Sequence, residues 1–487
     1  MNRKKSVKKN AVLNVIRVLS SVLFPLITFP YATRVLGADN IGKVQFGSSF
    51  IAYFSLIAAL GISTYGARDG AAKRNDKKEF SQFASELFTI NIISTLISYL
   101  LLFLILLFPT KLVEYRSLIF LQSLVIIFTT LGVDWIYAAQ EDYLYITIKG
   151  VMVQIISLVL LLLFVKQEED YLIYALITVI ANAGMNLFNF LHARRYCRLR
   201  LVRKLNLKQH KAPLLVLFAN AVAVNIYINS DIFMLGLIKT DAEVGLYSIS
   251  VKIYSVTKAL INAMIAVTIP RLVIYLKSNK TKYYNLSARL FNVCLLILLP
   301  SMTGIIMLKN EIIKIIAGSS FAAASSSLAI LGVALIFAVL SNYFANAVLV
   351  VNKKEKVVLC ATLIAAVGNI LLNLLAIPLY GQNGAAITTL ISEASVMIIC
   401  AFYGKKYFRL NNLIKTIAQC LGGCFIISLI CGIIKSFNLG IVYTVIISLI
   451  LCSIFYFVFL LVTKNDTVKK ITNEAMPKIK NKERGSK

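Results

Sequence analysis

Cationic side chains stand inside stretches of the sequence that are otherwise apolar. Arg17 lies in the first apolar stretch, and Lys252 and Lys258 lie together in a later one. A charge at the centre of a bilayer costs about 2.5 kcal/mol or more, so such a residue usually faces a wet cavity or a partner. Two interpretations stay open. The cations line a water-filled lumen, or Arg17 extends to the membrane surface while the lysines pair with Asp231 or Glu393.

Other polar residues share a helix face with these cations. At 3.6 residues per turn, each set falls within an arc of roughly 120°. Cations grouped in a wet lumen can bind an anionic group such as a phosphate. The first arc holds Asn14, Arg17, Ser20, Ser21 and Thr28, and the second holds Ser248, Lys252, Ser255, Lys258 and Asn262.

Rows of asparagine occur at helical spacing in three further apolar stretches. Amide side chains three or four residues apart lie on one face of a helix. They can hydrogen-bond to a neighbouring helix, and they also suit a hydroxyl-rich ligand. Both interpretations stay open. The rows are Asn182, Asn186 and Asn189; Asn225 and Asn229; and Asn369 and Asn373.

The composition is typical of a polytopic membrane protein. Of 487 residues, 59% are hydrophobic and 15% are charged, and a soluble globular protein is less apolar. Apolar runs of sufficient length predict about 14 transmembrane helices. Most of the 51 Lys and Arg residues precede the first span or follow even-numbered spans, which predicts that both termini are cytoplasmic. The net charge of +30 therefore indicates membrane topology and not a nucleic-acid partner.

Two distant parts of the chain share one plan. Residues 11–68 and 213–271 each contain two apolar spans joined by a short turn, followed by Ile41-Gly42 in the first copy and Val244-Gly245 in the second. A duplication that couples pairs of spans is typical of secondary transporters with two similar lobes.

The duplication predicts the domain organisation. We expect two similar membrane lobes that face each other. The longest breaks between spans, 66–83, 193–212 and 271–287, are expected on the cytoplasmic side. The predicted domains are an N-lobe of spans one to six (1–212), a C-lobe of spans seven to twelve (213–412), and spans thirteen and fourteen with a basic cytoplasmic tail (413–487).

Several motifs, taken in order, resemble bacterial polysaccharide repeat-unit flippases of the multidrug/oligosaccharidyl-lipid/polysaccharide exporter superfamily. The resemblance covers essentially the whole chain. One departure is Glu141, which stands where a glycine is expected after Gln140. The motifs are Pro30-Tyr31-x-x-Arg34-Val35-Leu36-Gly37, Asp134-Trp135-x-x-x-x-Gln140-Glu141, Asp231-x-x-Met234-Leu235-Gly236 with Val244-Gly245-x-Tyr247-Ser248, and Pro378-x-Tyr380-Gly381-x-x-Gly384-Ala385-Ala386 with Ser392-Glu393.

This resemblance implies two pseudo-symmetric six-helix lobes around a central cationic cavity, with two extra C-terminal helices. It also implies a transporter and not an enzyme. The expected substrate is an undecaprenyl-pyrophosphate-linked oligosaccharide, moved by alternating access from the inner to the outer leaflet of the bacterial cytoplasmic membrane. The product would be O-antigen, capsule or exopolysaccharide. The implied partners are the lipid-linked oligosaccharide, membrane lipids, and a polysaccharide polymerase with its chain-length protein. No cofactor is expected, although H⁺ or Na⁺ coupling is.

Under this interpretation, the polar residues receive separate roles. Arg17, Lys252 and Lys258 bind the pyrophosphate in the lumen, while Arg68 and Arg271 attract it on the cytoplasmic side and Arg34 receives it on the outer side. The residues expected to face the glycan are Asn14, Asn225, Asn229, Asn262, Asn369 and Asn373, and those expected to couple an ion are Asp134, Asp231 and Glu393.

Other functions remain as alternatives. A lipid II flippase would move a different glycan by the same mechanism. A cation-coupled multidrug exporter should have an acidic cavity, which the excess of Lys and Arg disfavours. A membrane glycosyltransferase would need acidic residues on an outward loop, and Glu168-Glu169-Asp170 stands on a short one. His192 and His210 offer no catalytic triad, and with the scattered cysteines they predict no metal site.

Overall fold

The computed structural model is built from helices. It describes residues 7–109, 111–203, 205–409 and 413–469, with the side chains of residues 7–19 and 21–23 excepted. This part of the chain contains no strand. Twelve of its helices are long and apolar enough to cross a membrane, which confirms the predicted all-helical polytopic fold.

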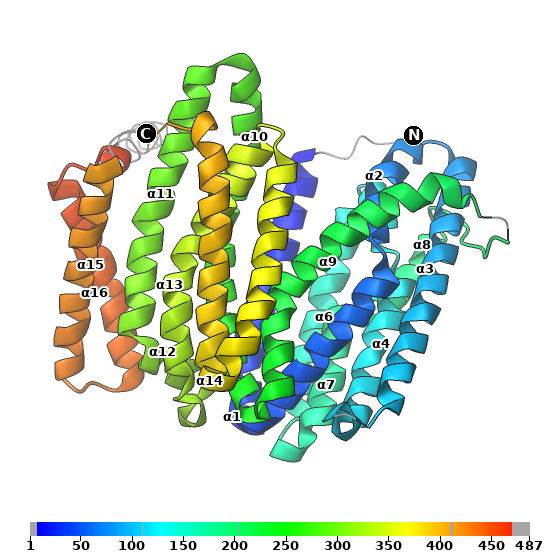
Figure 1. The fold of residues 1–487 in the computed structure, drawn as a ribbon, viewed down its shortest axis with the longest axis horizontal. Helices are drawn as coiled ribbons and strands as arrows, with labels where there is room; N and C mark the ends of the chain where they lie inside the picture. The colour runs from blue at the N-terminus through cyan, green and yellow to red at the C-terminus, as the bar shows by residue number, and fades with distance from the viewer. Residues whose placement is uncertain (1–6, 110, 204, 410–412, 470–487) are drawn as a thin grey trace, which may run out of the picture. The chain divides into compact units, whose positions relative to one another are not determined.

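Two of these helices each account for two predicted spans. α1 (Val7–Ala59) is kinked at Gly37, and α14 (Glu355–Gly404) is kinked at Gly381. Both glycines have a positive φ, 71° and 53° respectively, which a residue with a side chain rarely adopts. Figure 1 shows the two halves of α1 meeting at one end of the helix pair. The 12 long helices therefore agree with about 14 spans.

The chain divides into two compact units at Ser248 and Ile249, within α10 (Asp241–Ser278). The first unit includes α9 (Leu207–Ile238), which corresponds to the seventh predicted span and packs along α1 (Figure 1). The lobe boundary at residue 212 stays a prediction. Besides α1, the first unit contains α2 (Ile62–Lys73), α3 (Lys77–Leu107), η1 (Lys111–Tyr115), α4 (Arg116–Gly132), α5 (Asp134–Ala139), α6 (Tyr143–Phe164), η2 (Glu168–Asp170), α7 (Tyr171–Val179), the π-helix η3 (Ile180–Gly184), α8 (Met185–Ala193) and α9 (Leu207–Ile238).

The second unit packs its last two helices against α11. The hydroxyl of Tyr456 donates to the carbonyl oxygen of Leu296 at 3.0 Å, and the Lys435 ammonium donates to the carbonyl oxygen of Met307 at 2.5 Å. Besides the rest of α10 and α14, this unit contains α11 (Lys280–Met307), α12 (Lys309–Ala317), η4 (Ser319–Phe321), α13 (Ala324–Asn342), the π-helix η5 (Tyr343–Val350), η6 (Lys405–Tyr407), α15 (Leu413–Ser436) and α16 (Ile441–Val462).

Two of the predicted breaks are largely helical. α2 continues to Lys73 and α3 starts at Lys77, while α10 continues to Ser278 and α11 starts at Lys280. Hydropathy marks where the apolar layer ends, but lysine and arginine are good helix formers, so a helix can continue past that point. The third break, after α8, lies along α3, where Thr89 accepts a hydrogen bond from the Val202 amide at 3.0 Å.

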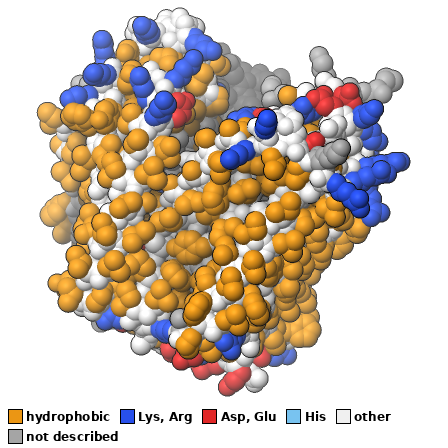
Figure 2. All heavy atoms as spheres, turned by 45° about the vertical axis from the view of Figure 1, so that its right-hand side comes forward, with side chains coloured by type: hydrophobic (Ala, Val, Ile, Leu, Met, Phe, Trp, Pro, Cys, Tyr) orange, Lys and Arg blue, Asp and Glu red, His pale blue; other side chains and the backbone are white. Residues whose placement is uncertain are grey.

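The outer surface of the helices is apolar. Figure 2 shows hydrophobic side chains covering the sides of the helices, with charged side chains gathered toward helix ends. Leu96 and Leu375, on two different helices, are 64% and 68% exposed. Helices that are hydrophobic on their outer faces belong in lipid.

Candidate functional site

One buried charge cluster of the second unit joins three helices. The Lys258 ammonium on α10 lies 2.6 Å from the Glu393 carboxylate on α14. The hydroxyl of Tyr254, one turn before Lys258, donates to the same carboxylate at 2.8 Å, and Ser341 on α13 donates to its other oxygen at 3.4 Å. Glu393 is only 3% exposed. A buried carboxylate needs such partners, because transfer of a charge out of water is costly.

Lys258 thus pairs with Glu393, one of the two acidic partners that the sequence analysis considered. The Lys258 side chain is still 28% exposed, so its ammonium remains reachable. Lys252, less than two turns before it on α10, is half-buried. The side chains of Arg17 and Asn14 lie outside the described part of the chain, so their predicted roles are not placed.

A second acidic residue is held within the first unit. Asp231 on α9 is 6% exposed and accepts a hydrogen bond from the Tyr247 hydroxyl at 3.0 Å. Both residues belong to motifs that the sequence singled out. Asp134, at the first turn of α5, accepts a hydrogen bond from the Asn189 amide. The three carboxylates expected to couple an ion therefore occupy separate clusters, each with its own polar partner.

The predicted glycan-facing asparagines divide into two groups. Asn369 and Asn373 are buried and hydrogen-bonded to each other at 3.0 Å, and Thr388 donates to Asn373 at 2.5 Å. The bond between Thr388 and Asn373 joins the two halves of α14 across the kink at Gly381. Asn225 and Asn229 are half-buried, and the amide nitrogen of Asn229 donates to the amide oxygen of Asn225 at 3.3 Å. The remaining asparagine, Asn262, has a buried amide oxygen without a hydrogen-bond partner among the described residues.

The arginines expected at the two ends of the transport path are exposed. Arg34 is exposed before the kink of α1, and Arg271 is exposed on α10. Arg68, on α2, pairs with its neighbour Asp69 at 2.6 Å. An exposed guanidinium can attract an anionic headgroup from solution, so their accessibility suits the predicted role without testing it.

The two turns of the sequence duplication meet inside the first unit. A side-chain carbon added at Gly42 would lie 1.8 Å from the carbonyl oxygen of Asp241, and one added at Gly245 would lie 2.0 Å from that of Ala38. Each glycine thus lets its own copy approach the backbone of the other copy. The contact is reciprocal, as expected where two related surfaces meet about a pseudo-two-fold axis.

Side chains from η1 hold this contact in place. The hydroxyl of Tyr115 donates to the Asp241 carboxylate at 2.8 Å. The ammonium of Lys111 donates to the carbonyl oxygens of Gly236 at 2.7 Å and Lys239 at 2.8 Å, at the end of α9. These bonds satisfy carbonyl groups that have no partner within their own helix.

One polar cluster was missed by the sequence analysis. His210 is 1% exposed at the start of α9, and its two ring nitrogens lie 3.0 Å from the Tyr65 hydroxyl and 2.8 Å from the Glu86 carboxylate. The sequence places His210 beside a basic linker, where a solvated residue is the simplest expectation. In the sequence, Glu86 stands within an apolar stretch, and a charge in such a place indicates that a buried polar partner exists.

Comparisons with known proteins identify the family. The family model described as "Polysaccharide biosynthesis protein" matches residues 7–276. The chain belongs to this family. A relative from Escherichia coli K12, named "Putative O-antigen transporter", is 24% identical over 81% of this chain and 96% of its own length. A second relative, "Probable low-salt glycan biosynthesis flippase Agl15" from Haloferax volcanii, is 25% identical over 43% of each chain.

Solved structures show the same fold. The lipid II flippase MurJ, in an inward closed conformation, has a TM-score of 0.76 at 16% identity and covers 94% of this chain and 100% of its own. An inward-facing multidrug transporter of the MATE family has a TM-score of 0.63 at 14% identity, over 80% of this chain and 97% of its own. The family match and the relatives therefore confirm the predicted family resemblance, and the solved structures confirm the fold. The protein is a multi-pass membrane transporter and not an enzyme.

Proposed function

We propose that this protein moves undecaprenyl-pyrophosphate-linked oligosaccharide repeat units from the inner to the outer leaflet of a bacterial cytoplasmic membrane. The match to the polysaccharide biosynthesis family carries this proposal. Two relatives named for O-antigen transport and glycan flipping support it. The transported units would then be assembled into O-antigen, capsule or exopolysaccharide by a polymerase and its chain-length protein.

The cations at membrane depth supply the chemistry that a pyrophosphate headgroup needs. Arg17, Lys252 and Lys258 belong to apolar spans, and the exposed part of Lys258 leaves its ammonium available to an anion although Glu393 holds it. A phosphate oxygen is a strong acceptor for such donors. We infer that the headgroup competes with Glu393 for Lys258, while the prenyl chain stays in lipid.

Transport would follow alternating access. The reciprocal contact at Gly42 and Gly245 joins the two copies at one end of their spans. We propose that this contact closes the outer side, with both termini in the cytoplasm, and that it separates when the cavity opens outward. The carboxylates Asp134, Asp231 and Glu393 are the candidates for H⁺ or Na⁺ coupling, since each can exchange a hydrogen-bond donor for an ion.

Deletion of the gene tests the proposal. We expect the deletion strain to lose its surface polysaccharide and to accumulate lipid-linked repeat units on the cytoplasmic side. Re-expression of the wild-type gene should restore both, and Ala variants of Arg17, Lys252 and Lys258 at equal membrane abundance should not. Unchanged polysaccharide in the deletion strain would contradict the proposal, and full activity in all three variants would contradict the cationic lumen.

A lipid II flippase is the second candidate. The likeness in fold to MurJ over 94% of this chain favours it. If the protein moved lipid II, its expression would rescue a strain depleted of its own peptidoglycan flippase. We expect no such rescue, because the family match points to surface polysaccharide.

A further inference from the structure

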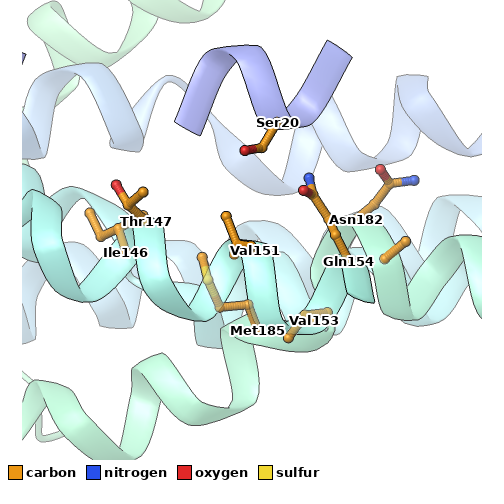
Figure 3. Close-up of a pocket in the computed structure, with 10 residues that line it drawn as sticks. Ser20, Ile146, Thr147, Val151, Val153, Gln154, Asn182 and Met185 are labelled. Atoms are coloured by element: carbon orange, nitrogen blue, oxygen red, sulfur yellow. The ribbon is translucent and has the colours of Figure 1, made fainter. Parts of the chain in front are cut away.

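A polar pocket lies wholly within the first unit, among α1, α6, η3 and α8. Its volume is about 250 Å³. Three of its polar side chains are Ser20 on α1, Gln154 on α6 and Asn182 in η3. Figure 3 shows the amide groups of Gln154 and Asn182 extending from neighbouring helices toward the segment of α1 that carries Ser20. Gln154 stands halfway along an apolar helix, so the pocket lies at membrane depth.

An irregular segment shapes one wall of this pocket. η3 is a π-helix between α7 and α8, and it carries Asn182. A short π-helix inside a longer helix widens one turn and is found frequently at functional sites. The irregularity is thus a second observation at the pocket, independent of its polar lining.

Apart from Thr147, which donates to the carbonyl oxygen of Tyr143 at 2.7 Å, the polar side chains that line the pocket have no hydrogen-bond partner among the described residues. None of Ser20, Gln154 and Asn182 hydrogen-bonds to another residue of the described chain. An unpaired amide at membrane depth is costly unless water or a ligand satisfies it. The pocket is large enough to admit either.

The lining also indicates which ligand is suitable. The described residues that line the pocket are all uncharged, so an ion would find no countercharge among these side chains. A purely apolar ligand would leave the amides unpaired at a cost. A side-chain amide both donates and accepts hydrogen bonds, and so does a hydroxyl group. The lining therefore matches a neutral, hydroxyl-rich molecule, with the apolar wall at Val151 and Met185 available to the carbon face of a ring.

We propose that this pocket binds one sugar unit of the transported glycan, through Gln154, Asn182 and Ser20. This inference rests on the proposed function and adds a site to it. The pocket is smaller than the roughly 300 Å³ at which sites for drug-sized molecules begin, which limits it to about one sugar ring. The cations bind the pyrophosphate, and this neutral pocket selects the glycan.

Cysteine labelling tests occupancy of the pocket in intact cells. A Val151→Cys variant, which keeps all three polar side chains of the pocket, is treated with N-ethylmaleimide, and labelling of this one position is read by mass spectrometry of its peptide. The probe is the cells' own lipid-linked glycan, present in one strain and absent from another that lacks the first glycosyltransferase. The matched control is Ile155→Cys, because Ile155 is 56% exposed on the lipid side of α6.

The glycan should protect the pocket position alone. We expect labelling at position 151 to slow about threefold when the lipid-linked glycan is present, as for a site two-thirds occupied, and labelling at position 155 to stay unchanged. Equal labelling at position 151 in both strains would overturn the proposal and leave a pocket that holds only water.

Export measurements provide a second test that does not depend on cysteine. Gln154→Leu and Asn182→Leu keep similar volumes but remove the amides, and each should lower the export rate about tenfold, which corresponds to ~1.4 kcal/mol. Asn182→Ser, which retains a donor and acceptor, should be less affected, and Ile155→Ala should export normally. All variants are compared at equal abundance in the membrane.

The two levels of the proposal fail in different ways. If wild-type re-expression restores export and the two Leu variants restore it equally well, the sugar pocket is wrong and the flippase function stands. If the deletion strain exports normally, the flippase function itself is wrong.

Discussion

Two buried carboxylates at membrane depth, Glu393 and Asp231, each have polar partners. The buried Glu393 is met by Lys258, Tyr254 and Ser341, and the buried Asp231 by Tyr247. Low dielectric surroundings strengthen such pairs and penalise an unmatched member equally strongly. A pair of this kind can hold a structure together, and it can also exchange partners when a substrate or ion arrives.

The Lys258–Glu393 pair should be required for stability. Lys258→Met leaves the carboxylate of Glu393 buried without its cation, which should cost about 3–5 kcal/mol. The double variant Lys258→Met/Glu393→Gln should recover most of this loss, because no uncompensated charge remains. Thermal unfolding of the purified proteins in detergent measures both effects. A single variant as stable as the wild type would contradict the account, and export by the double variant would exclude a role in headgroup binding.

The cluster of His210, Glu86 and Tyr65 should hold the start of α9 against α2 and α3. Glu86→Leu removes the partner of a buried ring nitrogen and should cost about 1–3 kcal/mol, whereas Glu86→Gln retains an acceptor and should cost less. Hydrogen exchange at the first turns of α9 measures the loss locally. If exchange there were equally slow in the Leu and Gln variants, the cluster would have no structural role.

The sequence identified individual charges better than their partners. Arg17, Lys252 and Lys258 were visible because a cation in an apolar run is rare, and Glu393 was named as a partner for the same reason. The sequence could not choose between Asp231 and Glu393, nor find the link from Glu86 to His210, 124 residues away. Such links depend on how helices pack, which hydropathy does not encode.

Glycines determine where the long helices kink and where they approach one another. Gly37 and Gly381 adopt backbone angles that suit glycine, and Gly42 and Gly245 allow backbone contact between α1 and α10. The sequence predicted a turn near Gly37 and marked the equivalence of Gly42 and Gly245. It did not predict that the two turns would touch, because a duplication shows likeness and not contact.

The contact between the two copies should be sensitive to a single methyl group. Gly42→Ala or Gly245→Ala places a carbon about 2 Å from a carbonyl oxygen, so the two backbones must separate. We expect a large loss of export, with increased labelling from outside the cell of cysteines introduced beside the contact. Gly368→Ala is the matched control, because nothing lies within 4 Å of its added carbon. Normal export by both contact variants would contradict a closed outer side here.

The stability of the first turn of α3 should depend on pH under acidic conditions. The Asp76 carboxylate accepts hydrogen bonds from the amides of Glu79 and Lys78, and these bonds lower the pKa of Asp76 below its usual 3.8. The folded state therefore favours the charged carboxylate of Asp76. The contribution of this carboxylate to the free energy of unfolding is complete above its usual pKa and is lost as the pH falls through the lowered pKa.

An Asp76→Asn variant isolates this effect, because asparagine also caps a helix but carries no charge. Hydrogen exchange at the first turn of α3 should be independent of pH in the variant between about pH 5 and pH 2. In the wild type, after correction for intrinsic exchange, protection should fall toward the lower end. Parallel profiles for the two proteins would show that the carboxylate has no such role.

The whole molecule combines a lipid-facing exterior with polar groups reserved for the interior of each unit. Composition alone predicted the membrane class, and the duplication predicted the kind of transporter. Hydropathy placed about 14 spans, which the 12 long helices match once the kinks of α1 and α14 are taken into account. The pocket of Gln154 and Asn182 was not predicted, because it depends on a π-helix that no sequence pattern marked.

Translocation by the purified protein tests the central claim most directly. The protein is reconstituted in liposomes that contain lipid-linked oligosaccharide extracted from its host, and glycans on the outer leaflet are oxidised by periodate, which does not cross the bilayer. Without protein, only the outward-facing part of the glycan should react. With the wild-type protein we predict that the whole pool of lipid-linked glycan is oxidised within minutes. With the Gly42→Ala protein, the inward-facing part of the pool should be oxidised far more slowly. A wild-type pool that stays half protected would contradict the claim that this protein is a flippase for lipid-linked glycans.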